Sequence, residues 1–99
     1  MGTNSTRGRG KVYDINDIEF VCTVSYQIHE ELDGDGNLIR WWGELTFIEN
    51  VRIHDGDRYV LELEDNRKGR CSLRRRINKA IISVPPRFYY LFQGTGPLK

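Results

Sequence analysis

The residues best suited to bind a ligand form a basic group in the second half of the chain, accompanied by one tryptophan. Three of the arginines, at positions 70, 74 and 76, share one face of an expected strand because strand side chains alternate. Guanidinium groups can follow the phosphates of a single-stranded nucleic acid while its bases stack on exposed rings. The candidate binding residues are Arg67, Lys68, Arg70, Arg74, Arg76, Lys79 and Trp42.

Charge is unevenly distributed along the sequence. Residues 66–99 carry nine basic side chains and no acidic one, whereas residues 11–65 carry all fourteen acidic side chains and four basic ones. Such a split indicates either an acidic or polyanionic partner or two halves that neutralise each other. Neutralisation is favoured by Glu62 and Glu64, which face the arginines across an expected hairpin, and by a pI of only about 7.8.

One acidic segment has part of the spacing of a calcium-binding loop. Asp33, Asp35, Asn37 and Glu44 stand at loop positions 1, 3, 5 and 12. Position 6, which needs glycine for its sharp turn, is Leu38. The segment is therefore interpreted as a polar hairpin turn.

No other pattern assigns a metal, a cofactor or a catalytic residue. His54, Asp55 and Asp57 lack the ligand spacing of a structural zinc site. No nucleophile stands in a glycine-flanked strand-to-helix turn. The glycines at 94 and 96 precede no helix that could hold a phosphate. The sequence therefore favours a protein that is not an enzyme.

Ninety-nine residues suit one domain, which at this size buries roughly 65% of its unfolded surface. The chain has no apolar run near the roughly 18 residues that span a bilayer and no apolar secretory signal, so we expect a cytoplasmic protein without a membrane segment. Cys22 and Cys71 are expected to be buried free thiols. Residues 1–12 and 95–99 are expected to be flexible tails around one β domain, 13–94.

Two hairpins are expected from alternating apolar residues. Residues 18–31 and 37–49 pair best when partner numbers sum to 67, which places Ile28 on Ile39 and Phe20 on Phe47 inside the sheet. Residues 58–64 and 70–77 pair best when they sum to 134, which sets Glu64 against Arg70.

The remaining segments complete an all-β prediction. Residues 72–83 also carry apolar residues at helical spacing, so an α+β fold with one helix is the alternative. Three arginines near its first turn oppose the helix dipole, which favours a short strand over 80–84 instead. A last strand is expected over 87–93. We expect five to six hairpin-connected antiparallel strands in a small barrel or a strongly curled sheet.

Three functions fit these features. A non-catalytic module that binds a protein partner is favoured by the segregated charge and by the outward Trp42. A barrel that binds single-stranded nucleic acid through its basic strand is the first alternative. A small-ligand barrel or enzyme lined by Tyr26, Trp41, Tyr59 and Tyr90 is the second, although aromatics in such positions commonly form core.

Overall fold

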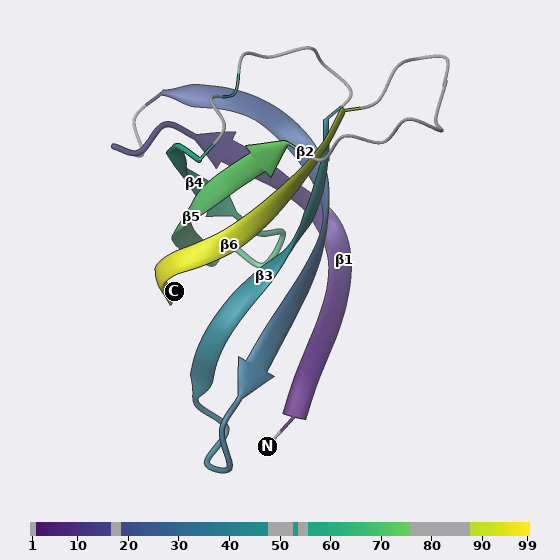
Figure 1. Ribbon diagram of the computed structural model, residues 1–99, viewed down its shortest axis with the longest axis vertical. Helices are drawn as coiled ribbons and strands as arrows, with labels where there is room; N and C mark the ends of the chain where they lie inside the picture. The colour runs from purple at the N-terminus through teal and green to yellow at the C-terminus, as the bar shows by residue number, and fades with distance from the viewer. Residues whose placement is uncertain (1, 17–18, 48–52, 54–55, 76–87) are drawn as a thin grey trace.

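The structure is a computed structural model that describes residues 2–16, 19–47, 53, 56–75 and 88–99. This part of the chain forms strands that close into an antiparallel barrel (Figure 1), so the expected all-β barrel is confirmed. Around the barrel the strands follow the order β1-β2-β3-β6-β5-β4. Their bounds are β1 (Gly2–Tyr13), β2 (Phe20–Leu32), β3 (Leu38–Phe47), β4 (Arg58–Glu62), β5 (Lys68–Arg75) and β6 (Phe88–Leu98).

The segment for which a helix was the alternative is only partly described. Residues 72–75 belong to strand β5. The rest of that segment, and the short strand expected over 80–84, lie outside the described residues. No helix long and apolar enough to cross a bilayer occurs in the described part of the chain.

Alternate side chains of the strands build the barrel interior. Cys22 and Cys71 are both buried free thiols, as expected. Burying apolar side chains contributes about 1.5–3 kcal/mol for each large residue, so this cluster supplies much of the favourable folding free energy. The core cluster consists of Val12, Cys22, Val24, Tyr26, Ile28, Trp41, Leu45, Phe47, Leu61, Leu63, Cys71, Leu73, Tyr90, Phe92 and Leu98.

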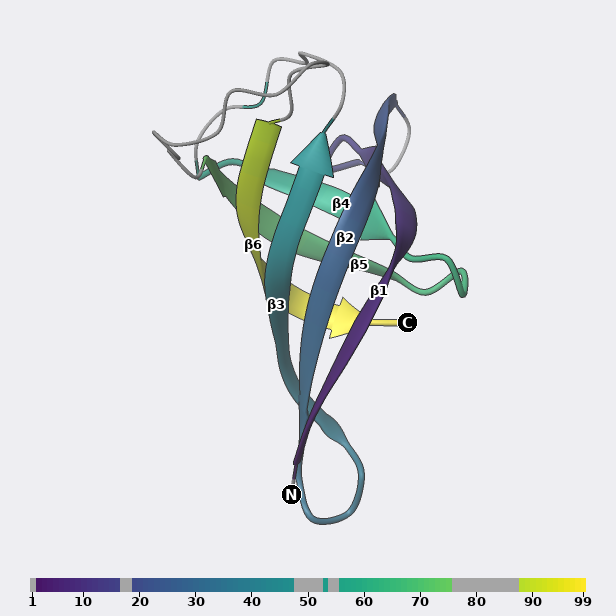
Figure 2. The ribbon, with the colours of Figure 1, turned by 90° about the vertical axis from the view of Figure 1, so that its right-hand side faces the viewer.

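The prediction of a flexible tail over residues 1–12 is wrong for residues 2–12, which lie in β1. Gly2–Tyr13 pairs with β2 along its whole length, and Lys11–Tyr13 also pairs with β4, which closes the barrel. Figure 2 shows the N-terminus beside the turn that joins β2 and β3. The segment lacks apolar alternation because residues 2–6 are exposed and Gly8 and Gly10 occupy inward positions, which leaves Val12 as its one buried apolar side chain.

The C-terminal tail expected over 95–99 is also largely strand. β6 continues to Leu98, which is buried and pairs with Gly69. Backbone hydrogen bonds between Lys68 and Lys99 run in both directions, at 2.7 and 2.9 Å. The chain end is therefore fixed against the start of β5.

In both hairpins, the numbers of two paired residues add up to a value that differs by four from the expected one. Tyr26 pairs with Leu45 and Ile28 with Gly43, so the β2–β3 pairs sum to 71. The turn is centred later than expected, because the Asp33 amide donates to the Asn37 carbonyl and a bulge follows Glu31. A shift by an even number keeps each side chain on its expected face.

The β4–β5 pairs sum to 130 because that turn is centred earlier, with Asn66 in the left-handed region at φ 73°. Glu62 therefore faces Lys68, and the expected opposition of Glu64 and Arg70 is wrong. Arg70 instead faces Val60.

Two apolar residues expected inside the sheet are exposed. Ile39 is 57% exposed on the part of β3 beyond its pairing with β6. Phe20 is 52% exposed, and a register irregularity near Tyr13 brings it edge-on to that ring, with centroids 5.8 Å apart. The expected inward placement of Ile39 and Phe20 is wrong because these positions lie at strand ends.

Candidate functional site

A groove on the outer face of β3, β6 and β5 brings two of the predicted binding residues together. Its volume is about 400 Å³. Trp41, Gly43 and Phe92, at buried positions of β3 and β6, also line it. The residues that we call the outer groove are Arg40, Trp42, Ser72, Arg74, Leu91 and Gln93.

Strand pairing explains why these side chains meet. Trp42 pairs with Gln93 and Gln93 pairs with Ser72, so the three form one row across β3, β6 and β5. Leu91 pairs with Arg74 in the next row and is 40% exposed. Because neighbouring strands lie about 4.8 Å apart, the row from Trp42 to Ser72 spans about 10 Å.

Trp42 is held within a small group of polar and aromatic side chains. The guanidinium carbon of Arg40 lies 4.4 Å from the centroid of the Trp42 ring, a cation–π distance. Arg40 Nε also donates to Glu31 Oε1 at 2.6 Å, which fixes its orientation. On β2, the His29 ring lies 5.5 Å from Trp42, and its Nδ1 is 2.7 Å from Ser5 Oγ.

Trp41, which also lines the groove, packs closely against β5 and β6. Its ring is buried between Gly69 and Gly94, where an added Cβ would come within 2.5 Å and 2.2 Å of ring atoms. Its indole N–H donates to the Gly96 carbonyl at 2.9 Å. β5 and β6 can therefore approach Trp41 closely only because these positions lack side chains.

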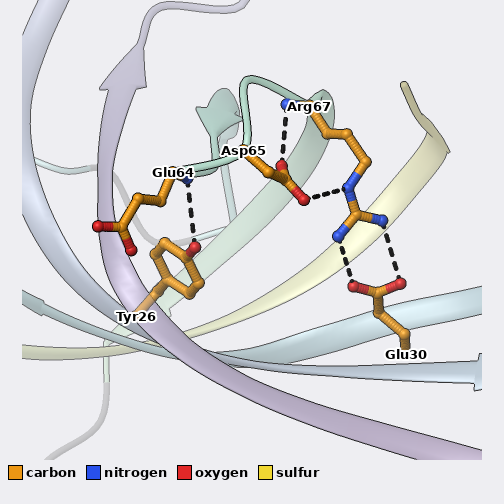
Figure 3. A network of polar contacts seen from close by, with 5 residues as sticks. All are labelled: Tyr26, Glu30, Glu64, Asp65 and Arg67. Atoms are coloured by element: carbon orange, nitrogen blue, oxygen red, sulfur yellow. Dashed lines mark hydrogen bonds and ion pairs between the residues drawn. The ribbon is translucent and has the colours of Figure 1, made fainter.

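Arg67 is part of a structural network and lies away from the outer groove. Its Nη2 and Nη1 bind the two carboxylate oxygens of Glu30 at 2.8 and 3.1 Å, and its Nε binds Asp65 at 2.8 Å (Figure 3). Hydrogen bonding to Glu30 is the main cause that raises the Arg67 pKa above its usual value. Beside this network, the Tyr26 hydroxyl accepts a hydrogen bond from the Glu64 amide at 3.2 Å.

The other predicted binding residues are spread over the surface. Lys68 lies 3.6 Å from Glu62 and 5.1 Å from the centroid of the Tyr13 ring, away from Trp42. Arg70 is exposed on the same face of β5 as Arg74 but does not line the groove. Arg76 and Lys79 lie outside the described residues.

Sequence reasoning identified Trp42 and Arg74 but missed the other outer-groove residues. The missing information was the pairing of β6 between β3 and β5, which places Gln93 and Leu91 beside them. Three aromatics considered as a ligand pocket, Tyr26, Trp41 and Tyr90, are buried in the core.

The acidic segment between β2 and β3 forms a hydrogen-bonded turn. Asp33 Oδ1 accepts from the Asp35 and Asn37 amides at 2.8 and 2.9 Å. These backbone hydrogen bonds, that from Asn37 above all, lower the Asp33 pKa. No group of three or more potential metal ligands occurs within the described ranges.

Comparison with protein-family models, curated proteins and solved structures finds no match to this chain.

Proposed function

We propose that the barrel binds single-stranded nucleic acid in the outer groove. The observation that carries this proposal is the pairing of a stacking platform on β3, formed by Trp42 and Arg40, with the exposed guanidinium of Arg74 on β5. Small β-domains hold single strands by combining such stacking surfaces with cations that contact phosphates. None of the residues that line this groove is acidic.

Each side chain of the outer groove has a distinct role in this proposal. Arg40 covers the indole of Trp42, so a base extends the stack by lying on the guanidinium plane. Ser72 and Gln93 offer neutral hydrogen-bonding groups to the edges of that base. Arg74 contacts a phosphate, which makes binding sensitive to salt.

The experiment is a titration of labelled RNA and DNA dodecamers, followed by fluorescence anisotropy at several salt concentrations. Wild-type protein should bind with an affinity that falls as salt rises. Trp42→Ala should weaken binding by about fivefold or more, since stacking contributes about 1–3 kcal/mol per base. Trp42→Phe, which keeps a ring, should weaken it less. Absence of binding by the folded wild-type protein at low salt would overturn the proposal.

A protein partner is the second candidate, and the edge of β1 favours it. In the described part of the chain, residues 2–10 of β1 pair with β2 on one side, and pairing with β4 begins only at Lys11. A partner strand could add to such an edge through backbone hydrogen bonds. Replacing Thr3 by Pro, near the end of this edge, should weaken that addition while leaving oligonucleotide binding in the outer groove unchanged.

A further inference from the structure

The outward face of β1 carries a row of three cations. Arg7, Arg9 and Lys11 are all exposed, and they alternate with Gly8 and Gly10. Alternate residues of a strand lie about 6.8 Å apart on one face. This spacing is close to the phosphate repeat of a stretched single strand. We call Arg7, Arg9 and Lys11 the β1 row.

The glycines between these cations are required by packing inside the barrel. A Cβ at Gly8 would lie 2.5 Å from the Tyr26 hydroxyl, and one at Gly10 would lie 2.5 Å from the Glu62 carbonyl oxygen. Neither position can carry a side chain without movement of its neighbours. Packing therefore explains the two glycines, whose positions face the barrel interior. Packing inside the barrel does not account for the cations on the other face.

On β2 the residues opposite the β1 row are neutral, whereas on β4 the acidic residue Glu62 pairs with Lys11. Arg7 pairs with Gln27, Arg9 with Ser25 and Lys11 with Thr23, so no carboxylate faces these cations across β2. No ion pair links the β1 row to another residue within the described ranges. Arg67 and Lys68, by contrast, form ion pairs with Glu30 and Glu62.

Two rows of outward side chains lead from β1 toward the outer groove: the row of Arg7 runs through Gln27 to Glu44, and the next row begins at Ser5. Ser5 on β1 pairs with His29, which pairs with Trp42. Figure 2 shows β1, β2 and β3 side by side, with β6 beyond β3. Along the route through β2, two strand spacings separate β1 from β3, about 10 Å, and four separate β1 from β5, about 19 Å.

We infer that a single strand held in the outer groove continues across β2 and that the β1 row binds its phosphates. This inference rests on the proposed function and adds a second contact region to it. The ligand class is a single-stranded phosphodiester, RNA or DNA, long enough to extend from Arg74 to Arg7. A trinucleotide fills the outer groove alone, whereas a dodecamer reaches both regions.

The test compares Arg7→Ser/Arg9→Ser with wild type on a thymidine trimer, a thymidine dodecamer and a uridine dodecamer. For the dodecamers, the slope of log affinity against log salt should decrease in magnitude by about 1.4, since each lost phosphate contact removes about 0.7. Affinity for the trimer should not change. The dodecamer that wild-type protein binds more tightly identifies whether RNA or DNA is the preferred strand.

Two controls separate charge from position. Arg7→Lys/Arg9→Lys keeps both cations and should keep the wild-type slope, whereas Lys99→Ser removes a cation outside both regions and should also keep it. An unchanged slope in Arg7→Ser/Arg9→Ser, with the trimer still bound, would overturn this inference alone. Absence of binding by the folded wild-type protein, to the trimer and to both dodecamers, would overturn this inference together with the proposed function.

Discussion

Arg67 and Glu30 form a two-point ion pair that joins the β4–β5 turn to β2. The distances are 2.8 Å from Nη2 to Oε1 and 3.1 Å from Nη1 to Oε2, between residues 37 positions apart. The side chain of Glu30 is 13% exposed and that of Arg67 36% exposed. An arginine that the sequence suggests as a phosphate ligand is therefore a cross-link within the barrel.

Removing one partner of this pair should destabilise the fold. Arg67→Ala leaves the largely buried Glu30 carboxylate without its principal partner and should lower the free energy of unfolding by about 2 kcal/mol, less than for a fully buried pair. Glu30→Leu/Arg67→Leu removes both charges and should recover most of this loss. Urea denaturation of the three proteins measures the difference. A double variant no more stable than Arg67→Ala would argue against the cross-link.

Two glycines near Trp41, Gly94 and Gly96, allow a matched pair of substitutions. Gly94→Ala places a Cβ about where the indole lies, 2.2 Å from a ring atom, and should cost about 2–3 kcal/mol of stability through overpacking. Gly96→Ala meets nothing within 4 Å and should change stability by less than about 0.5 kcal/mol. Thermal unfolding of both variants checks the contrast. Equal effects would show that Trp41 is not confined by Gly94.

Cys71 should make stability fall at alkaline pH. Burial raises the pKa of its thiol from 9.0 to about 12, so the native protein keeps the proton that the unfolded chain loses. Stability should be unaffected by this group below about pH 9 and should fall progressively between pH 9 and 12, by a few kcal/mol in total, on the order of 1 kcal/mol per pH unit. Comparing denaturation of wild type and Cys71→Ala across this window isolates the effect. Parallel pH profiles would contradict it.

Glu44 should oppose ligand binding. It lies on β3 in the row of Leu91 and Arg74, so its carboxylate is close to the path of a bound phosphate. Glu44→Gln should raise affinity for a dodecamer about two- to threefold at low salt, the effect of one like charge about 8 Å away in water. High salt should abolish the gain. Weaker binding by Glu44→Gln would indicate that the strand does not pass this row.

The sequence predicted the strand faces better than the strand partners. Alternation placed Tyr26 and Ile28 inside because the period of a strand is independent of its neighbour. Register depends on the turn, and hydrogen bonds at Asp33 and the left-handed Asn66 moved both turn centres. The alternation did not reveal β1 because Gly8 and Gly10 face inward and residues 2–6 are exposed, so Val12 alone gives a hydrophobic signal.

The candidate site was predicted in part for the same reason. Trp42 and Arg74 could be assigned to an outer face from their own strands. Arg67 could not be assigned to a network with Glu30, because the two residues meet only after the barrel closes. Gln93 and Ser72 carry no distinctive pattern, so only strand order brings them beside Trp42.

The most direct test of the proposed nucleic-acid site compares Arg74→Ser with Arg70→Ser. Both arginines are exposed on one face of β5, four positions apart, but only Arg74 lines the outer groove. Dodecamer binding is measured by anisotropy between low and high salt. Arg74→Ser should reduce the magnitude of the salt slope by about 0.7 and weaken binding at low salt, while Arg70→Ser stays close to wild type. Equal losses in the two variants, or none in Arg74→Ser, would contradict binding in the outer groove.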